Sequence, residues 1–293
     1  MNHILLLGGT GILGSEVRSQ LTAKNIEFQS PSSANVDVRD LVQLSEFVQM
    51  YKPHWIINCA AWTNVDGAEE SFGQAKELNE VAVRNIAKTA LVNTCSVIHL
   101  STDYVFDGLS SVAYDENSPV IPVNKYGESK LLGESALSNT LPNDSYVIRT
   151  SWLYGVNGRN FVKTMAAKAL KNEVANVVDD QMGSPTSARD LAGAILNIME
   201  KAPAPGIYHY SNSGSCSWFE LARTIYSIVG ADPALVHPIK TASLNLKARR
   251  PHFSLLSKEK WRSAELSEIP EWEDALEELL PEILAGLRNS EAL

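Results

Sequence analysis

The stretch Ile4-Leu5-Leu6-Leu7-Gly8-Gly9-Thr10-Gly11-Ile12-Leu13-Gly14 decides the fold of this chain. Its apolar run has the length of a buried strand, and residues 12–23 that follow have helical spacing. The glycines let the backbone turn tightly and let a pyrophosphate approach the helix N-terminus, where backbone amides and the helix dipole attract an anion. A glycine-rich loop between a strand and a helix therefore favours nucleotide binding over a structural turn.

Strands and helices alternate along the rest of the N-terminal half. Apolar runs predict strands at residues 3–7, 26–29, 55–58, 96–100 and 146–148. Helical spacing predicts helices at residues 12–23, 41–51 and 74–92. Because this alternation is typical of right-handed βαβ units, we expect an α/β fold with a Rossmann-type doubly wound parallel sheet over residues 1–150.

The second half of the chain has a looser pattern. It predicts helices at residues 161–170, 187–199 and 271–287, and strands at residues 174–178 and 207–210. Ser217 and Glu220 match a capping box for a further helix that ends at residue 229. We expect residues 151–293 to form mainly a smaller substrate-binding lobe, with residues from about 187 to 210 returning to the Rossmann domain.

Composition limits the possible partners. The chain has 293 residues, of which 44% are hydrophobic and 20% charged, as in ordinary globular proteins. A net charge of −9 argues against a nucleic-acid partner. We see no secretory signal and no run near the ~20 apolar residues that span a bilayer, so we expect a cytoplasmic protein without a membrane partner. The three cysteines and six histidines lack metal-ligand spacing, which predicts no metal site.

Tyr126 and Lys130 are four residues apart, so a helix places them on one face, about 40° apart and roughly 6 Å along the axis. An ammonium beside a phenol lowers the tyrosine pKa from its usual value near ~10. A phenol tuned in this way exchanges a proton with a carbonyl or alcohol near neutral pH. The same spacing also occurs by chance on exposed helices, so the pair needs support from the rest of the chain.

Thr102 ends a predicted strand, where ligand sites form in doubly wound sheets. Its hydroxyl could bond a substrate carbonyl oxygen or merely cap the next turn. Three elements in order resemble the extended, sugar-nucleotide-modifying branch of the short-chain dehydrogenase/reductases. The first element is the glycine loop, with G-x-x-G-x-x-G spacing. The second comprises two strand ends, Asn58-Cys59-Ala60-Ala61 and Leu100-Ser101-Thr102-Asp103-Tyr104-Val105-Phe106. The third is Tyr126-Gly127-Glu128-Ser129-Lys130.

A narrower resemblance covers residues 8–251. Ala60-Ala61-Trp62-Thr63-x-Val65-Asp66, Arg149-Thr150-Ser151-Trp152-Leu153-Tyr154-Gly155, Asp180-Gln181-Met182-Gly183-Ser184-Pro185-Thr186 and Ala248-Arg249-Arg250-Pro251 are similar to the dTDP-4-dehydrorhamnose reductases. That family reduces the C4 ketone of dTDP-4-dehydro-β-L-rhamnose to dTDP-β-L-rhamnose with NADPH or NADH, the last step of dTDP-L-rhamnose synthesis. The resemblance implies the same reaction here.

The resemblance also implies roles for individual residues. Tyr126 would donate the proton, Lys130 would lower its pKa and bind the nicotinamide ribose, and Thr102 would position the carbonyl oxygen. Asp103 and Trp152 would contact the sugar nucleotide. The expected cofactor-binding residues are Gly8, Thr10, Gly11, Ile12, Leu13, Gly14, Ser30, Asp37, Val38, Ala60, Ala61, Trp62, Thr63, Tyr126 and Lys130.

The choice between NADPH and NADH depends on the end of the second strand. An acidic residue there would accept the ribose hydroxyls of NADH and repel a 2′-phosphate. Gln29, Ser30, Pro31 and Ser32 contain no acid, and Glu27 reads as mid-strand. The tip also has no arginine to hold a 2′-phosphate. We therefore expect NADPH, with NADH tolerated.

Several alternatives remain open from the sequence. Arg249 and Arg250 could clamp a diphosphate or lie solvated at the surface. Some family members bind Mg²⁺ at a dimer interface. The acidic residues of 271–278 could bind Mg²⁺ in this way or form a solvated helix face. Monomer and homodimer are both possible. A dehydratase would resemble Thr-Asp-Glu where this chain has Tyr104, and epimerases usually have a longer substrate lobe than the residues after Ser151. A non-catalytic regulatory subunit, like the β subunit of methionine adenosyltransferase, would not need Thr102, Tyr126 and Lys130 together.

Overall fold

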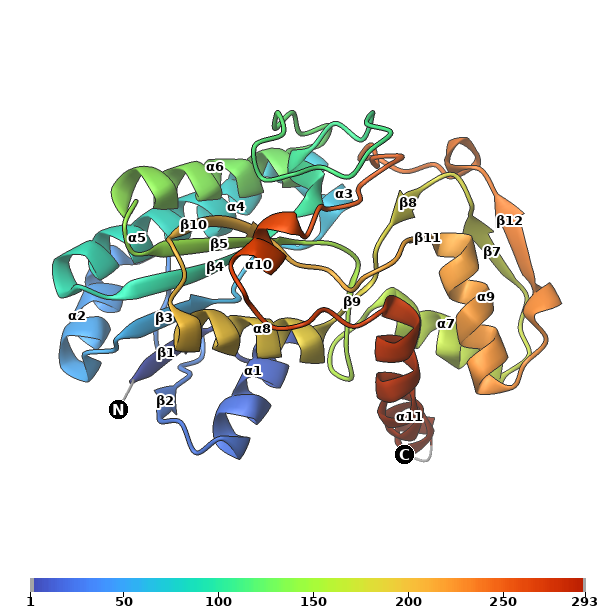
Figure 1. The fold of residues 1–293 in the computed structure, drawn as a ribbon, viewed down its shortest axis with the longest axis horizontal. Coiled ribbons are helices and arrows are strands. Elements are labelled where there is room, and N and C mark those ends of the chain that lie inside the picture. Colours follow the sequence, from blue (N-terminus) through green and yellow to red (C-terminus); the bar gives the residue numbers. More distant parts are fainter. Residues whose placement is uncertain (1–2, 292–293) are drawn as a thin grey trace.

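A six-stranded parallel sheet forms the centre of the larger part of the molecule (Figure 1). The computed structural model describes residues 3–291, with side chains through residue 288. The strands are β1 (Ile4–Leu7), β2 (Phe28–Gln29), β3 (Trp55–Asn58), β4 (Ser96–Thr102), β5 (Ser145–Thr150) and β10 (Gly206–His209). Their order is β10-β5-β4-β3-β1-β2, and all neighbours are parallel. The predicted doubly wound α/β class is confirmed.

Helices cover both faces of this sheet, because successive strand residues point to opposite sides. Leu6 and Ile57 pack with α1 (Ile12–Ala23) and α8 (Ala188–Lys201) on one face. Leu5 and Ile56 pack on the other face, against α2 (Leu41–Tyr51), α5 (Ala82–Asn93) and α6 (Lys125–Thr140). The continuous apolar runs predicted as strands are therefore buried on both sides.

A smaller lobe lies beyond the carboxyl ends of the strands (Figure 1). Its core is made by α7 (Phe161–Leu170), α9 (Trp218–Val229) and α11 (Trp272–Glu291). The strands β7 (Ala175–Val178) and β12 (Val236–Ile239) pair in parallel beside them. The predicted capping box at the start of α9 is confirmed, since Ser217 and Glu220 each bond the other's backbone N–H.

Short elements join these parts. They are α3 (Val65–Glu70), α4 (Phe72–Lys76), a π-helical turn (Glu77–Val81), β6 (Leu153–Tyr154), β8 (Met182–Gly183), β9 (Thr186–Ser187), β11 (Cys216–Ser217), α10 (Glu259–Ser263), and 3₁₀ turns at Asp103–Val105, Pro233–Leu235 and Thr241–Ser243. After α7 and β7 the chain returns to the large sheet, where α8 packs on α1 and β10 pairs with β5. The division of the chain into two domains stays a prediction.

Several predicted elements differ from the structure in their bounds, and two of these differences have a clear physical cause. The second strand begins at Phe28 rather than residue 26, because Asn25 has a left-handed φ of 52° and the Ile26 N–H still bonds Leu21 in the turn after α1. The helix predicted over residues 74–92 is interrupted by the π-helical turn. The apolar spacing on either side of that turn is helical, so periodicity alone did not reveal it.

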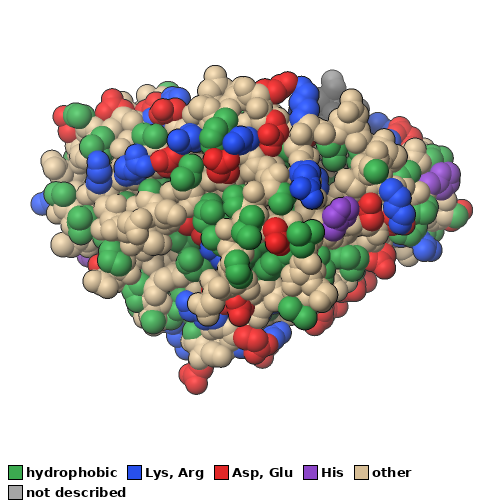
Figure 2. All heavy atoms as spheres, turned by 90° about the horizontal axis from the view of Figure 1, so that it is seen from above, with side chains coloured by type: hydrophobic (Ala, Val, Ile, Leu, Met, Phe, Trp, Pro, Cys, Tyr) green, Lys and Arg blue, Asp and Glu red, His purple; other side chains and the backbone are tan. Residues whose placement is uncertain are grey.

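The loop between the Asp103–Val105 turn and α6 crosses the top of the molecule in Figure 1. On it Leu109, Val112 and Ile121 are exposed. Figure 2, which views the molecule from that side, shows apolar side chains gathered near the middle with charged side chains around them. Within residues 3–291, no helix has the length and apolar character needed to cross a membrane.

Candidate active site

The glycine loop lies at the point where the strand order reverses, between β1 and β3. Ligands bind at such switch points in doubly wound sheets. Gly8 has a φ of +76°, and a Cβ there would lie 2.5 Å from the backbone N of Ala60. Only glycine allows this contact. Beside it opens a cavity of about 830 Å³, lined by nine of the predicted cofactor residues: Gly8, Thr10, Gly11, Ser30, Asp37, Val38, Ala60, Ala61 and Trp62.

The start of α1 suits a diphosphate. Its N-cap is Gly11, and no side chain of the described residues caps the helix. The amides of the first turn are therefore free to bind an anion. A Cβ at Gly14 would lie 2.2 Å from the carbonyl oxygen of Gly8, so the helix packs closely against its own loop. These residues fit a dinucleotide cofactor.

Other predicted cofactor residues do not line this cavity. Leu13 is buried in the core between α1 and the sheet. Ile12 faces Gly155 and Gly158 of the lobe instead. Thr63 is exposed just beyond Trp62. Direct contacts of these three residues with a cofactor stay predictions.

The start of α6 is held against the end of β4. Asn124 caps the helix by accepting the Gly127 N–H at 2.8 Å. A Cβ at Gly127 would lie 2.1 Å from the carbonyl oxygen of Tyr104, so only glycine permits this approach. The Tyr126 ring consequently meets the Tyr104 ring edge-on, with 5.8 Å between centroids. This packing places the phenol of Tyr126 beside Thr102.

The predicted direction of the Tyr126 pKa is wrong for this structure. Tyr126 is half-buried as a residue, but burial of its phenol raises the pKa to about 12. The Thr102 hydroxyl lowers this pKa, and the Asp103 charge raises it further. Lys130 is not among the causes, because its ammonium is directed at the Leu100 carbonyl oxygen, 2.6 Å away. Tyr126 is therefore a protonated phenol at neutral pH.

Lys130 is buried, and burial lowers its pKa to about 8. Its Nζ also lies 3.4 Å from Nε2 of His99. The other ring nitrogen of His99 lies 3.1 Å from the Asn58 amide nitrogen, and the Asn58 side-chain oxygen accepts the Ala60 N–H. A chain of polar contacts therefore joins Lys130 to the lining of the glycine-loop cavity. Sequence analysis considered His99 only as a metal ligand and missed this link.

Thr102 performs the capping role that the sequence left open, and it also faces the site. Its hydroxyl accepts the Tyr104 N–H at 3.2 Å and donates to Oδ1 of Asp103 at 3.0 Å. Asp103 is buried, and burial raises its pKa to about 6 although the hydroxyls of Ser254 and Thr102 lower it. Its Oδ2 has no hydrogen-bond partner within the described part of the chain. A buried acceptor of this kind is suited to a ligand hydroxyl.

Asn79, in the π-helical turn, is a second residue that sequence analysis missed. Its Oδ1 accepts the Trp62 N–H at 2.8 Å, while its Nδ2 donates to the Trp62 carbonyl oxygen and to Ser129 Oγ, at 3.0 and 2.9 Å. Asn79 thus ties the cavity lining to the helix that carries Tyr126. Single π-helical turns are frequent at functional sites. The available signal was an asparagine among the buried positions of an otherwise apolar helix face.

Trp152 lies shortly after β5 and packs against the core of the smaller lobe. Its φ of 47° is unusual for a bulky residue. Its ring stacks on Trp218 with 3.7 Å between centroids and 11° between planes. A Cβ at Gly183 would lie 2.5 Å from the Trp152 ring, so glycine is needed behind it. Trp218 was not predicted as a site residue. It follows the capping residue Ser217, and the sequence indicated only that it belongs to the helix α9.

Comparison with known proteins decides the family. The family model described as the RmlD substrate binding domain matches residues 1–285. The dTDP-4-dehydrorhamnose reductase of Streptomyces griseus is 36% identical over 281 residues, which cover 94% of this chain and 92% of that protein. The chain belongs to the dTDP-4-dehydrorhamnose reductase family.

Other relatives agree with this assignment to the dTDP-4-dehydrorhamnose reductase family. A Streptomyces niveus protein named dTDP-4-keto-6-deoxy-D-glucose reductase is 35% identical and covers 94% of this chain and 96% of its own length. The crystal structure of dTDP-4-dehydrorhamnose reductase from Bacillus anthracis in complex with NADP has a TM-score of 0.92 at 36% identity, covering 96% of this chain and 100% of that one. UDP-glucose 4-epimerase of Thermus thermophilus, at 17% identity and a TM-score of 0.81, shares the fold alone.

The two arginines of the family motif differ in their surroundings. Arg250 forms a bidentate pair with Asp66 of α3, at 2.7 and 3.1 Å, so its guanidinium is already engaged. Arg249 is exposed, and Asn124 bonds its backbone carbonyl oxygen. A diphosphate clamp by Arg249 stays a prediction, and Arg250 instead fastens its segment to α3.

The Mg²⁺ site that the family resemblance left possible finds no support. Among the described residues, no group of three or more His, Cys, Asp or Glu side chains could hold a metal ion. On α11, Glu278 and Glu282 both pair with Arg189 of α8, at 3.6 and 2.7 Å. We propose no Mg²⁺ site.

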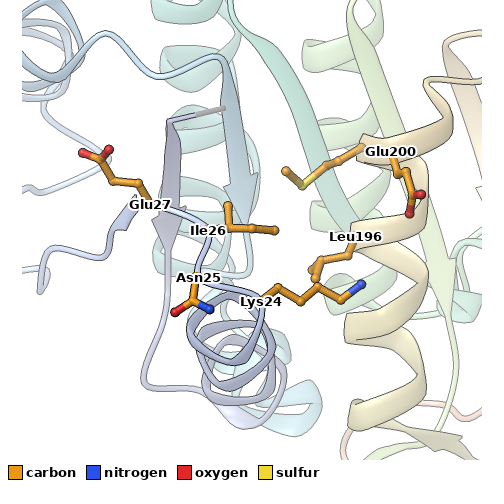
Figure 3. Close-up of a pocket in the computed structure, with 7 residues that line it drawn as sticks. Lys24, Asn25, Ile26, Glu27, Leu196 and Glu200 are labelled. Carbon is orange, nitrogen blue, oxygen red and sulfur yellow. The ribbon is translucent and has the colours of Figure 1, made fainter. Parts of the chain in front are cut away.

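A second cavity, of about 380 Å³, lies at the other end of α1, away from the glycine loop. Ile26 and Leu196 face one another across it, and Lys24 runs along its edge (Figure 3). Glu27 points away from it and pairs with His3 at 3.3 Å. The cavity contains none of the residues predicted for catalysis or cofactor binding in this reductase family.

Proposed function

We propose that the protein reduces the C4 ketone of dTDP-4-dehydro-β-L-rhamnose to dTDP-β-L-rhamnose, with NADPH as the reductant. The observation that carries this proposal is the position of Tyr126, a phenol that keeps its proton at neutral pH, beside Thr102 at the carboxyl end of β4. Reducing a ketone requires a hydride on carbon and a proton on oxygen. A protonated phenol next to the cofactor cavity supplies that proton.

NADPH, when bound, supplies the hydride. Tyr126 then gives its proton to the C4 oxygen as that oxygen becomes an alkoxide. In the structure the hydroxyl of Thr102 donates to Asp103. With substrate bound, this hydroxyl can turn toward the ketone and serve as a second donor. Lys130 has three N–H donors and uses one on Leu100, so it can bond the nicotinamide ribose with another.

Two residues support recognition of the substrate. The unpartnered Oδ2 of Asp103 can accept a hydrogen bond from a sugar hydroxyl. Trp152 is half-buried, and its flat ring can stack on a base. Both assignments match the roles that the resemblance implied.

The relatives favour one specific alternative substrate. The Streptomyces niveus relative is named for a dTDP-4-keto-6-deoxy-D-glucose substrate. The stereochemistry of the accepted 4-keto sugar therefore needs a direct test. Dehydration and epimerisation are weaker candidates, because Tyr104 stands at the position of the glutamate in the Thr-Asp-Glu pattern of dehydratases.

The test is an assay of the purified protein with NADPH and enzymatically made dTDP-4-dehydro-L-rhamnose. We expect loss of NADPH absorbance and one equivalent of dTDP-L-rhamnose, identified by NMR. A parallel reaction with dTDP-4-keto-6-deoxy-D-glucose compares the alternative through kcat/KM. Failure to oxidise NADPH with either sugar would reject the reductase and favour a non-catalytic role.

A further inference from the structure

The structure assigns a role to Arg18. We propose that Arg18, together with the hydroxyl of Ser30, binds the 2′-phosphate of NADPH and thereby sets the preference for NADPH over NADH. This inference rests on the proposed function, because it concerns the cofactor of that reaction. It concerns residues that the family resemblance did not single out for this purpose: Arg18 was not predicted, and Ser30 was predicted only as a cofactor contact.

Gly9 reveals where the two side chains meet. A Cβ at Gly9 would lie 2.0 Å from Ser30 Oγ and 3.0 Å from Arg18 Cδ. Both side chains therefore border the same point of the glycine loop. Ser30 directly follows β2, and it lines the cofactor cavity. In Rossmann folds the adenosine ribose lies at the end of the second strand, so this point is where a 2′-phosphate would project.

Arg18 has a guanidinium available for a phosphate. It is exposed on α1 and forms no ion pair with any described residue. A guanidinium presents planar donors that match phosphate oxygens. The Arg18 side chain therefore borders Gly9, which lines the cavity, and no carboxylate of the described residues pairs with its guanidinium.

Arg39 is the competing candidate, since it lines the cavity directly, whereas Arg18 borders it only at Gly9. Its Nε donates to Asp37 Oδ1 at 2.9 Å and its Nη2 to Oδ2 at 2.7 Å. This fork holds the pKa of Asp37 below its usual range. A phosphate would have to displace the Asp37 carboxylate to reach Arg39, so Arg18 is the better ligand.

Two acidic residues line the cavity, Asp37, which is paired with Arg39, and Glu77, and neither directly follows β2 as Ser30 does. Glu27, the acid nearest β2 in sequence, pairs with His3 and points away from the neighbouring hollow (Figure 3). The residues after β2 that line the cavity include Ser30, Ser32 and Ser33, whose hydroxyls can donate to phosphate oxygens. The sequence showed no arginine at the tip of the second strand; the Arg18 side chain approaches Gly9, beside Ser30, from the preceding helix.

Binding measurements test the proposal without requiring turnover. Calorimetry compares NADPH with NADH, and 2′,5′-ADP with 5′-AMP, for the wild-type protein and for Arg18→Gln, Arg18→Lys, Arg39→Gln and Arg223→Gln. We expect Arg18→Gln to weaken binding of the two 2′-phosphate ligands about tenfold or more, the scale of one charge-assisted hydrogen bond, with little change for NADH and 5′-AMP. Arg18→Lys should keep part of the preference, and Arg223→Gln, on the exposed surface of α9, should keep all of it.

The outcomes separate this inference from the proposed function. If Arg18→Gln keeps the wild-type preference for 2′,5′-ADP over 5′-AMP, the role of Arg18 is overturned. The same holds if only Arg39→Gln loses this preference. Equal wild-type affinity for the two fragments would overturn it as well, even if the enzyme oxidises NADPH. If the ratio depends on Arg18 but no keto sugar is reduced, the subsite stands and the proposed function fails.

A second variant tests the same subsite by adding charge. Ser30→Asp places a carboxylate where it can accept ribose hydroxyls and repel a 2′-phosphate. We expect this variant to bind NADH more tightly than NADPH. An unchanged order of affinities would place the 2′-phosphate away from Ser30 and reject the subsite.

Discussion

The ammonium of Lys130 donates a hydrogen bond of 2.6 Å to the carbonyl oxygen of Leu100. This bond ties α6, which carries Tyr126, to β4, which ends at Thr102. Tyr126 and Thr102, the proposed proton donor and carbonyl ligand, are thereby held on two elements that are bonded together. Lys130 is in this structure an anchor between two elements, rather than the group that ionises Tyr126.

Replacing Tyr126 with phenylalanine should remove the proton donor while leaving the cofactor cavity intact. We expect kcat to fall by roughly 10² or more, the usual scale for loss of a general acid. Steady-state kinetics of NADPH oxidation measures this, and urea unfolding of the variant serves as the control for an intact fold. A rate near that of the wild type would exclude Tyr126 from proton transfer.

The pKa of Asp103 predicts a pH-dependent cost to stability. Burial raises this pKa to about 6 in the folded protein, above its ordinary value. Between about pH 4 and pH 6 the folded state therefore binds more protons than the unfolded state, and stability falls as the pH rises. Asp103→Asn avoids this loss, so it should be more stable than the wild type at pH 7, by about 3 kcal/mol.

Urea unfolding of the wild type and Asp103→Asn across this pH range checks the prediction. The advantage of the variant should shrink as the pH falls through 6 and vanish below about pH 4, where both states of the wild type are protonated. An advantage that does not change with pH would show that Asp103 ionises normally in the folded protein.

Gly183→Ala should disturb substrate binding through Trp152. The new Cβ would lie 2.5 Å from the Trp152 ring, so the ring must move and its stack on Trp218 must open. We expect a several-fold rise in KM for the nucleotide sugar, a change in tryptophan fluorescence and an unaltered Kd for NADPH. Gly73→Ala is a matched control, since a Cβ there meets no atom within 4 Å. Equal KM values for the two variants would separate Trp152 from substrate recognition.

Glu134→Gln should weaken the fold behind the site. Glu134 and Arg149 form a bidentate pair at 2.7 and 3.0 Å, and both side chains are at most 3% exposed. Removing one charge leaves the other buried and uncompensated, which typically costs about 3–5 kcal/mol. Urea unfolding measures the loss, and Glu173→Gln, which breaks the exposed pair with Lys168, should cost less than about 1 kcal/mol. Similar losses in both variants would contradict this difference.

Local patterns carried much of the prediction. The apolar run at Ile4–Leu7 and the glycines after it specify a strand, a turn and a helix start, because each depends on neighbouring residues only. The spacing of Tyr126 and Lys130 likewise follows from helix geometry. The motifs distributed between Gly8 and Pro251 were sufficient for the family. Capping by Ser217 was also predictable, because its partner Glu220 is three residues away.

Contacts between distant segments decided the rest. The pKa of Tyr126 depends on burial beside β4, where Gly127 lets α6 approach Tyr104. No periodicity could show that Lys130 bonds Leu100 rather than Tyr126.

The sequence by itself determined the alternating elements, the glycine loop, the family and the candidate residues for the chemistry, since these are encoded in short-range patterns. Only the tertiary structure decided that Tyr126 keeps its proton and that Arg18 meets Ser30 at Gly9. Desolvation and pairing between elements depend on the order and packing of the strands, which bring together residues far apart in the chain.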